Sequence, residues 1–359
     1  MVLVMAGCAR DGLPGGAPPD LATVDASIDA HTIIDASMPS PSTPDLAASI
    51  DAHTIIDASP GPPLPDLAPP RWVALPVPTG NDLRGVWTDR QRVWAVGAQG
   101  TILFSPDDGA TWQLQPSGTT ADLEDVAGVP GTSEAFAVGR GGTMLHYGGG
   151  VGWTPVHAGV TVDLHGICMS DRFLAVGDSG TVLTGSRNTG GWEWTSYVLS
   201  PPANLRAVAT AVSYVITPPN YDIVSIASDQ GLFAIGAKGW QVVDPTVMRT
   251  VAGVNGASDG QPNVFALGDS GQSLISYDGA QWSPFPIGAT MRLNGAWGAS
   301  NFDCAPQLRA VGAGGLAILV EGSCSAQSGV VETTGTTADL YDVWYDFAVG
   351  DHGTVLHRN

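Results

Sequence analysis

The chain has 359 residues, of which 34 are acidic and 14 are basic, so its net charge at pH 7 is −20. This balance excludes a nucleic-acid partner, because phosphate binding requires a basic surface that so few cations do not supply. Only 13% of the residues are charged, while 47 glycines and 11 tryptophans favour an all-β protein of many short strands and tight turns.

The N-terminus carries a candidate lipidation site. Met5-Ala6-Gly7-Cys8 resembles the bacterial lipobox, in which the cysteine becomes the lipidated first residue of the mature chain. Seven residues precede Cys8 and none is basic, whereas an export signal has a charged region and about 7–15 apolar residues. Either the start lies further upstream or the match is a coincidence. We expect an exported protein, attached to a cell envelope or surface through Cys8 or secreted, with no other membrane contact.

Residues 9–70 have the composition of a disordered linker. They are rich in Pro, Ala, Asp and Ser, contain no aromatic residue, and repeat SIDAHTIIDAS unchanged at 27–37 and 49–59. Such a segment buries too little apolar surface to offset its conformational entropy. His31 and His53, one in each copy, form a conceivable metal pair, but a disordered spacer explains the duplication better, and we expect no metal site.

From Arg71 onward one string recurs along the chain. Its copies are VWAVGAQGTILFS at Val93, AFAVGRGGTMLHY at Ala135, FLAVGDSGTVLTG at Phe173, IVSIASDQGLF at Ile223, VFALGDSGQSLIS at Val264, LRAVGAGGLAILV at Leu308 and DFAVGDHGTVLHR at Asp346. The copy at Ile223 is the loosest. If it is degenerate, the number of units would be six instead of seven.

Tryptophans give an independent register. Each of six tryptophans is followed eleven residues later by an aliphatic residue, in the pairs Trp72/Leu83, Trp112/Leu123, Trp153/Leu164, Trp194/Leu205, Trp240/Val251 and Trp282/Leu293. Leu340 is the seventh aliphatic residue, and successive members lie 40 to 47 residues apart. The two registers therefore agree on seven units.

Each unit contains four strand-sized pieces separated by Gly-rich turns, which is typical of a β-propeller blade. The last unit ends one strand short, while RWVALPVPTGNDL, which precedes the first unit, aligns without a gap on TWQLQPSGTTADL. We therefore predict a seven-bladed propeller over residues 71–359, closed by pairing of residues 71–76 with the C-terminal strand. Closure would remove the open edges of the ring.

SPDDGATW, between the third and fourth strands of the first unit, predicts a turn. Asp107 can accept backbone N–H groups, and Gly109 can adopt a positive φ. Ser105 completes the turn, and Thr111 and Trp112 are expected to begin the outer strand. We interpret this Asp box as structural and place it on the face opposite the ligand-binding one.

The Asp box and the AVGxxGT strings resemble the neuraminidase-type (BNR-repeat) propellers, and within them the branch related to photosystem II stability and assembly factors. That resemblance covers residues 71–359 and implies a non-enzymatic, seven-bladed protein that binds other proteins. It also implies a basic, Arg-rich binding face, from which this acidic chain departs. The fold itself hosts many functions.

A catalytic site is hard to find in the sequence. The arginine motif and the Tyr–Glu pair of retaining sialidases are missing, and no nucleophile elbow, phosphate loop or metal-ligand spacing occurs. Other propeller glycosidases use two carboxylates about 5–10 Å apart, a role for which Asp122, Asp163 and Asp339 are candidates. Asn204 at the equivalent place indicates a turn-stabilising position instead. We expect no cofactor.

The predicted binding face combines two sets of residues that vary where the scaffold repeats. The residue after each aliphatic marker forms a ring made of Arg84, Glu124, His165, Arg206, Ala252, Asn294 and Tyr341. The turns between the second and third strands add Asp178, Asp229, Asp269 and Asp351. Solvated loops would explain the same variation.

Three cysteines remain beside Cys8. Cys304 and Cys324 flank one hairpin symmetrically, and we predict that they form a disulfide, as suits an exported protein. Cys168 is expected to be a buried small hydrophobic residue. Together these features predict a monomeric, non-catalytic binding or assembly module with a protein partner. The alternative is a propeller that binds or cleaves glycans.

Overall fold

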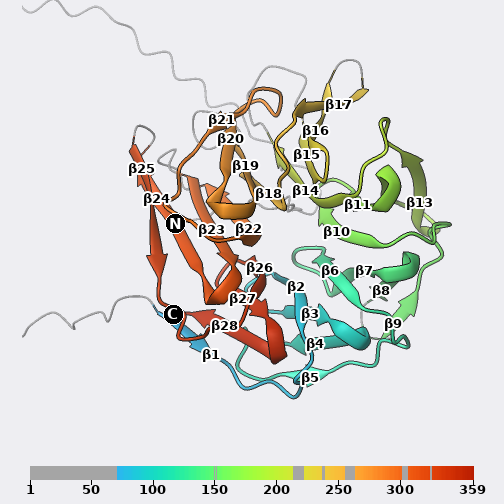
Figure 1. The fold of residues 1–359 in the computed structure, drawn as a ribbon. Coiled ribbons are helices and arrows are strands. Elements are labelled where there is room, and N and C mark those ends of the chain that lie inside the picture. Colours follow the sequence, from blue (N-terminus) through green and yellow to red (C-terminus); the bar gives the residue numbers. More distant parts are fainter. Residues whose placement is uncertain are drawn as a thin grey trace, which may run out of the picture. The chain divides into compact units, whose positions relative to one another are not determined.

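The computed structural model describes residues 71–148, 150, 152–212, 222–236, 239–254, 263–300, 306–323 and 326–359. Within these residues, seven antiparallel four-stranded sheets are arranged as blades around a central axis (Figure 1). This confirms the predicted seven-bladed propeller. Cys8, His31, His53, Cys304 and Cys324 lie outside the described residues, so lipidation and the disulfide stay predictions.

The first three blades follow the chain from the innermost strand outward. Blade 1 comprises β2 (Leu83–Thr88), β3 (Val93–Gly97), β4 (Thr101–Ser105) and β5 (Gln113–Leu114). Blade 2 comprises β6 (Leu123–Gly128), β7 (Glu134–Gly139), β8 (Met144–Gly148) and β9 (Trp153–Pro155). Blade 3 comprises β10 (Leu164–Met169), β11 (Phe173–Gly177), β12 (Thr181–Asn188) and β13 (Gly191–Val198).

The other four blades repeat this order. Blade 4 comprises β14 (Leu205–Val212), β15 (Asp222–Ser228), β16 (Gly231–Gly236) and β17 (Gly239–Asp244), and blade 5 comprises β18 (Thr250–Val254), β19 (Asn263–Leu267), β20 (Ser273–Ser276) and β21 (Ser283–Pro284). Blade 6 comprises β22 (Leu293–Ser300), β23 (Pro306–Gly312), β24 (Ala317–Ser323) and β25 (Ala326–Glu332). Blade 7 comprises β26 (Leu340–Trp344), β27 (Phe347–Gly350), β28 (Thr354–Arg358) and β1 (Trp72–Ala74).

Six of the blades connect their second and third strands by a short 3-10 turn. These turns are η1 (Ala98–Gly100), η2 (Arg140–Gly142), η3 (Asp178–Gly180), η4 (Asp269–Gly271), η5 (Ala313–Gly315) and η6 (Asp351–Gly353). Blade 4 differs, because Ser228 pairs directly with Gly231 and the turn between them has only two residues.

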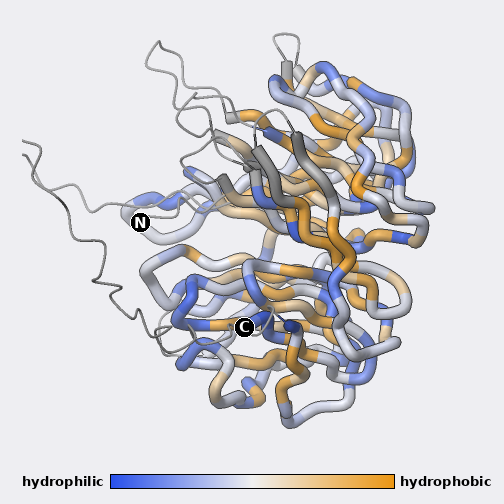
Figure 2. Tube along the Cα trace, turned by 90° about the vertical axis from the view of Figure 1, so that its left-hand side faces the viewer, coloured by the Kyte–Doolittle hydropathy of each residue, from blue (hydrophilic) through white to orange (hydrophobic). Residues whose placement is uncertain are grey.

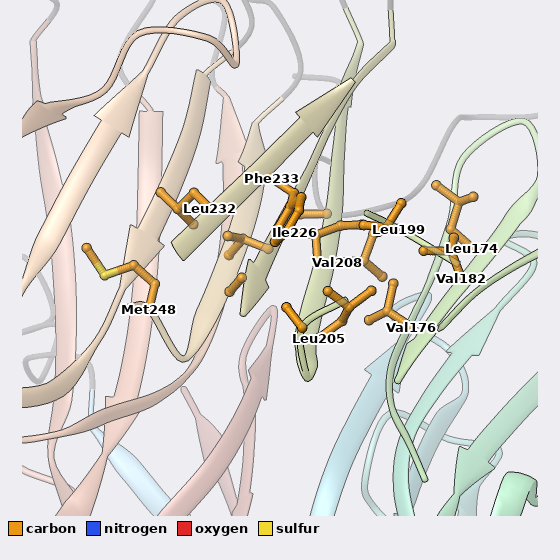
Figure 3. Packing of buried hydrophobic residues seen from close by; sticks show 14 of the residues in the cluster. Leu174, Val176, Val182, Leu199, Leu205, Val208, Ile226, Leu232, Phe233 and Met248 are labelled. Atoms are coloured by element: carbon orange, nitrogen blue, oxygen red, sulfur yellow. The ribbon is translucent and has the colours of Figure 1, made fainter. Parts of the chain in front are cut away.

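The core lies in the seams between blades. Every residue of β3 is buried, because both faces of a blade pack against its neighbours. Figure 3 shows the packing on both sides of blade 4, where Val176 of blade 3, Val208 and Phe233 of blade 4, and Met248 beside blade 5 belong to one apolar cluster. Hydrophobic residues follow the strands and hydrophilic residues gather in the turns (Figure 2). The sequence therefore reads as apolar runs broken at each turn.

Blade 7 closes the ring with strands from both ends of the propeller. Trp72 of β1 pairs with Arg358 of β28, and Ala74 pairs with Leu356. The indole Nε1 of Trp72 also donates a hydrogen bond of 2.8 Å to Glu332 of blade 6. Figure 1 shows β1 at the outer edge beside β28. The predicted closure is confirmed.

One tryptophan lies across the central channel. Trp87 and Trp297 are buried in blade seams, whereas Trp344, at the equivalent place in blade 7, packs against apolar clusters from both sides of the ring. Its Nε1 donates to the carbonyl of Thr88 at 3.0 Å. The Trp344 indole thus forms a floor of the channel at the end opposite the 3-10 turns.

Candidate functional site

The predicted ring residues share one structural cause. In blade 1, Leu83 pairs with Gly97 and Gly85 pairs with Val96, so Arg84 is the extra residue of a β-bulge. Bulges re-aim side chains and end regular pairing. The same shift in register isolates Glu124, His165, Arg206, Asn294 and Tyr341.

Blade 5 has no such bulge. Its ring residue, Ala252, pairs regularly with Phe265 and is buried in the seam with blade 6. The cation of this blade is Arg249, which comes three residues earlier in the chain. Sequence reasoning missed Arg249, because the ring position was extrapolated to a blade whose strand enters without the extra residue.

We call the face formed by these bulges and the 3-10 turns the top face. The second residue of each turn is left-handed, with a φ of 57° at Ser179. In five of the six turns, the N–H of this residue points to the next blade, where an Asp or Asn oxygen accepts it. These bonds run from Gln99 to Asp122 (2.9 Å), Gly141 to Asp163 (2.8 Å), Ser179 to Asn204 (3.2 Å), Gly314 to Asp339 (2.7 Å) and His352 to Asp82 (2.9 Å).

In three blades the ring residue binds the first residue of its own turn. Glu124 accepts a hydrogen bond from Arg140 at 3.0 Å, His165 lies 2.9 Å from Asp178, and the Tyr341 hydroxyl donates to Asp351 at 2.6 Å. Burial and the bond to Asp351 raise the pKa of Tyr341 to about 12. Tyr341 therefore stays a neutral phenol.

Blades 1 and 6 have alanine at the first turn position, so their ring residues reach the next blade instead. Arg84 binds Asp122 at 3.0 Å and Glu124 at 2.7 Å. Asn294 donates to the carbonyl of Leu340 at 2.7 Å. The N–H of Gln99, and then Arg84, lower the pKa of Asp122.

Blade 4 leaves its ring residue unpaired. In its shortened turn, the Asp229 carboxylate accepts the N–H of Asn204 at 3.0 Å instead of meeting Arg206. Among the described residues, the exposed Arg206 side chain makes no hydrogen bond or ion pair. The irregular repeat thus frees one guanidinium.

Two further arginines of the top face are paired. Arg249 binds Asp269 through two nitrogens, at 2.6 and 3.3 Å, and Arg292 binds Asp339 at 2.8 Å. The bond from Arg249 chiefly lowers the pKa of Asp269, to which the charge of Arg206 also contributes. Arginines therefore occur on the top face of this acidic chain, but carboxylates of the same face pair with Arg249 and Arg292.

A pocket opens on the top face where these residues meet. It has a volume of about 290 Å³ and is lined by Glu124, His165, Asp178, Asn204, Arg206, Arg249 and Asn294. A second cavity of about 120 Å³ lies in the channel and includes Arg84 and Tyr341. Of the eleven residues of the predicted binding face, Asp229, Asp269 and Asp351 line neither cavity and serve their own blades as described above.

The Asp box lies on the opposite face, because β4 begins at the top-face turn and ends at Ser105. Asp107 accepts the N–H and hydroxyl of Thr111 at 2.8 and 2.7 Å, and the hydroxyl of Ser105 accepts the N–H of Gly109 at 2.8 Å. The bonds from Thr111 lower the pKa of Asp107. Trp112 packs on Phe347 of blade 7. The outer strand β5 begins at Gln113, slightly later than predicted.

Other candidate chemistry is sparse in the described part of the chain. Cys168 is buried on β10, as expected. Within the described ranges, no three His, Cys, Asp or Glu side chains are grouped so as to hold a metal ion. The same ranges contain no helix long and apolar enough to cross a membrane.

Comparison with known families gives a partial match. A family model described as photosynthesis system II assembly factor YCF48 matches residues 79–148. The photosystem II assembly lipoprotein Ycf48 of Synechococcus sp. (strain RCC307) is 34% identical over 77 residues. That alignment spans 21% of this chain and 23% of the relative's length.

Solved structures match over most of the propeller. One described as YCF48 bound to D1 peptide has a TM-score of 0.57 and 16% identity, and the match covers 82% of this chain and 95% of that one. YCF48 from Cyanidioschyzon merolae has a TM-score of 0.59 and 15% identity, over 80% and 98% of the two chains. The chain is therefore similar to the assembly-factor propellers, and at this identity the structures establish the fold.

Proposed function

We propose that this chain is a non-catalytic binding module that holds a segment of a protein partner in the top-face pocket. The free Arg206 guanidinium at that pocket carries the proposal. A guanidinium binds a carboxylate through two parallel hydrogen bonds, so an unpaired arginine at a pocket suits an acidic side chain or a C-terminal carboxylate. Asn204 and Asn294 add polar groups to the same wall.

The comparisons support a protein as the partner. The similar proteins are named assembly factors, and one similar propeller was solved with a peptide bound. We extend only the class of ligand, a peptide segment, to this chain. The relative named a lipoprotein also supports export and attachment through Cys8, with residues 9–70 as the tether.

The chemistry of the candidate carboxylates Asp122, Asp163 and Asp339 argues against the glycosidase alternative. A glycosidase acid needs a carboxyl whose pKa is raised, whereas the pKa of Asp122 is lowered. Asp122, Asp163 and Asp339 each hold a neighbouring turn. Tyr341 is bonded to an aspartate and has a raised pKa, which opposes a nucleophilic role.

The test is selection from a displayed library of random peptides with free C-termini, followed by affinity measurement on the best binders. We expect carboxylate-bearing peptides, and we expect Arg206→Ala to weaken their binding at least about tenfold, since a hydrogen bond to a charged group contributes about 1.5–3 kcal/mol. Peptides and glycans incubated with the protein should show no change in mass, because a non-catalytic module cleaves no bond in them.

Arg140→Ala is the matched control, because it removes the same charge from the same face at a residue paired with Glu124 and outside the pocket lining. Equal losses in both variants would reduce Arg206 to a general charge effect and contradict the proposal. So would glycan cleavage, or enrichment of peptides whose binding ignores Arg206.

A further inference from the structure

The channel beneath the top-face pocket contains a cavity that the proposed function leaves unused. Its volume is about 120 Å³, close to the roughly 150 Å³ of a protein cavity known to admit benzene. The cavity and the pocket share the lining residues Glu124, His165, Arg206, Arg249 and Asn294. The pocket therefore continues downward into the cavity, and the end of a side chain can enter from the top face.

Asp342 is a carboxylate in the wall of this cavity. Its Oδ2 accepts the N–H of Val86 in blade 1 at 2.9 Å, and its Oδ1 accepts the N–H of Val343 at 2.8 Å. On its other side lies Gly295 of blade 6, where an added Cβ would stand 2.5 Å from the Asp342 Cα. The two carboxylate oxygens are thus each held by a backbone N–H group, one from blade 1 and one from blade 7, while the residue as a whole stays partly exposed.

Within the described part of the chain, no cation neutralises this carboxylate. No arginine, lysine or histidine of the described residues forms an ion pair with Asp342. Arg84, two residues before Val86 in blade 1, is paired with Asp122 and Glu124 instead. Removing a charge from water without a partner is strongly unfavourable. Burial accordingly raises the pKa of Asp342 to about 7.

The groups facing Asp342 come from several strands. β2 presents the backbone at Gly85 and Val86, and β22 presents Gly295 without a side chain. Asp125, whose Oδ2 accepts the N–H of Ile167 at 2.8 Å, approaches the other side of Gly85. The remaining charged or titratable side chains of the cavity are Arg84, Glu124, His165, Cys168, Arg206, Arg249 and Tyr341.

Trp344 supplies the floor. It belongs to the same strand as Asp342, two residues further from the mouth, and lines the cavity. The face of an indole attracts cations, and more strongly when the pair is removed from water. A fixed carboxylate above an aromatic floor is a combination that recognises an ammonium group.

We propose that the channel cavity binds a primary ammonium group, as carried by a lysine side chain of the bound partner segment, with Asp342 as its counter-ion and Trp344 beneath it. An ammonium is a compact charge on a flexible stem and fits a narrow entry, whereas a guanidinium is a wider planar fork. As a statement about a partner this rests on the proposed function. The cavity itself is tested separately.

The experiment follows the side-chain carboxyl carbon of Asp342 by NMR in the full isotope-labelled chain between pH 4 and 9. The probe is n-butylammonium, and 1-butanol at matched ionic strength is the neutral control. An opposite charge nearby lowers a carboxyl pKa by about 1–3 units. We expect the Asp342 midpoint to fall by about one unit or more with n-butylammonium and to stay unchanged with 1-butanol.

An unchanged midpoint, or an equal shift with the alcohol, would overturn the assignment. Arg206→Ala should lose peptide binding and keep the n-butylammonium effect, so the two proposals fail independently. We expect n-butylammonium to raise the melting temperature of the unmodified chain and to leave that of Asp342→Asn unchanged. If this variant does not fold, the titration of the unmodified chain still decides.

Discussion

Gly109 sits in the Asp-box turn with a φ of 82°, and a Cβ there would stand 2.7 Å from the Phe347 ring of blade 7. Phe347 is buried and stacked on His357, so it cannot move aside cheaply. We expect Gly109→Ala to cost about 1–2 kcal/mol for the left-handed backbone and a further 1–3 kcal/mol for overpacking.

Chemical denaturation of Gly131→Ala separates the cost of the left-handed backbone from the cost of overpacking. Gly131 has a φ of 74° and nothing within 4 Å of its would-be Cβ, so it should show the backbone cost alone. Equal destabilisation by the two substitutions would mean that the Asp-box turn does not press on the neighbouring blade.

Asp342 also predicts how stability depends on pH. Its pKa of about 7 lies above the roughly 4 of an unfolded aspartate, so folding favours the protonated form. Its contribution to stability is therefore complete below about pH 4 and is lost as the pH rises through 7. Other carboxylates, such as Asp122 and Asp269, have lowered pKa values and act in the opposite direction.

The comparison with Asp342→Asn isolates this residue. Between pH 4 and 7, the free energy of unfolding of the unmodified chain should decline relative to that of the variant. The variant has a lower free energy of unfolding from the start, because an amide has one oxygen and cannot accept both N–H groups. The test is therefore the slope of the free energy of unfolding against pH and not the constant difference between the two proteins. Parallel curves for the two proteins would show that Asp342 titrates normally.

At the scale of the element, the two-residue turn of blade 4 is the feature that frees Arg206. Inserting one glycine between Gln230 and Gly231 would give a three-residue turn of the kind found in blade 3. We expect Asp229 then to meet Arg206, as Asp178 meets His165. Peptide affinity should fall about as far as in Arg206→Ala, while the melting temperature stays close to that of the parent.

The same insertion combined with Asp229→Ala is the control for this prediction. It lengthens the turn in the same way but supplies no carboxylate, so binding should persist. Loss of binding in both insertion variants would show that the length of the turn, and not the pairing of Arg206, decides the affinity.

The bulges and turns also show what sequence can predict about the site. The ring positions follow from a fixed offset after each aliphatic marker, and this offset holds wherever the strand enters through a bulge. Blade 5 lacks the bulge, so the offset points to buried Ala252 and misses Arg249. The missing residue in the ASDQG turn is visible in the sequence, but its effect on Arg206 depends on side-chain directions that no spacing specifies.

At the scale of the whole molecule, the repeat predicts the architecture because spacing alone specifies it. Seven units of similar length, one strand short at one end and one strand in excess at the other, allow a single closed ring. The channel is less accessible to such reasoning. Trp87, Trp297 and Trp344 hold equivalent positions, yet only Trp344 lies across the channel. That difference depends on how side chains from all seven blades pack together in the channel.

Ring closure itself predicts a consequence of removing β1. Deleting residues 71–76 would expose the edge of β28, with its row of unpaired N–H and C=O groups, and would break the bond between Trp72 and Glu332. Because open edges pair with other chains, we expect a lower melting temperature and concentration-dependent association in light scattering. Deleting residues 13–69 instead leaves β1 in place and should change neither property. If the chain without residues 71–76 stayed monomeric and kept its melting temperature, the apolar seams alone would hold blade 7 against its neighbours.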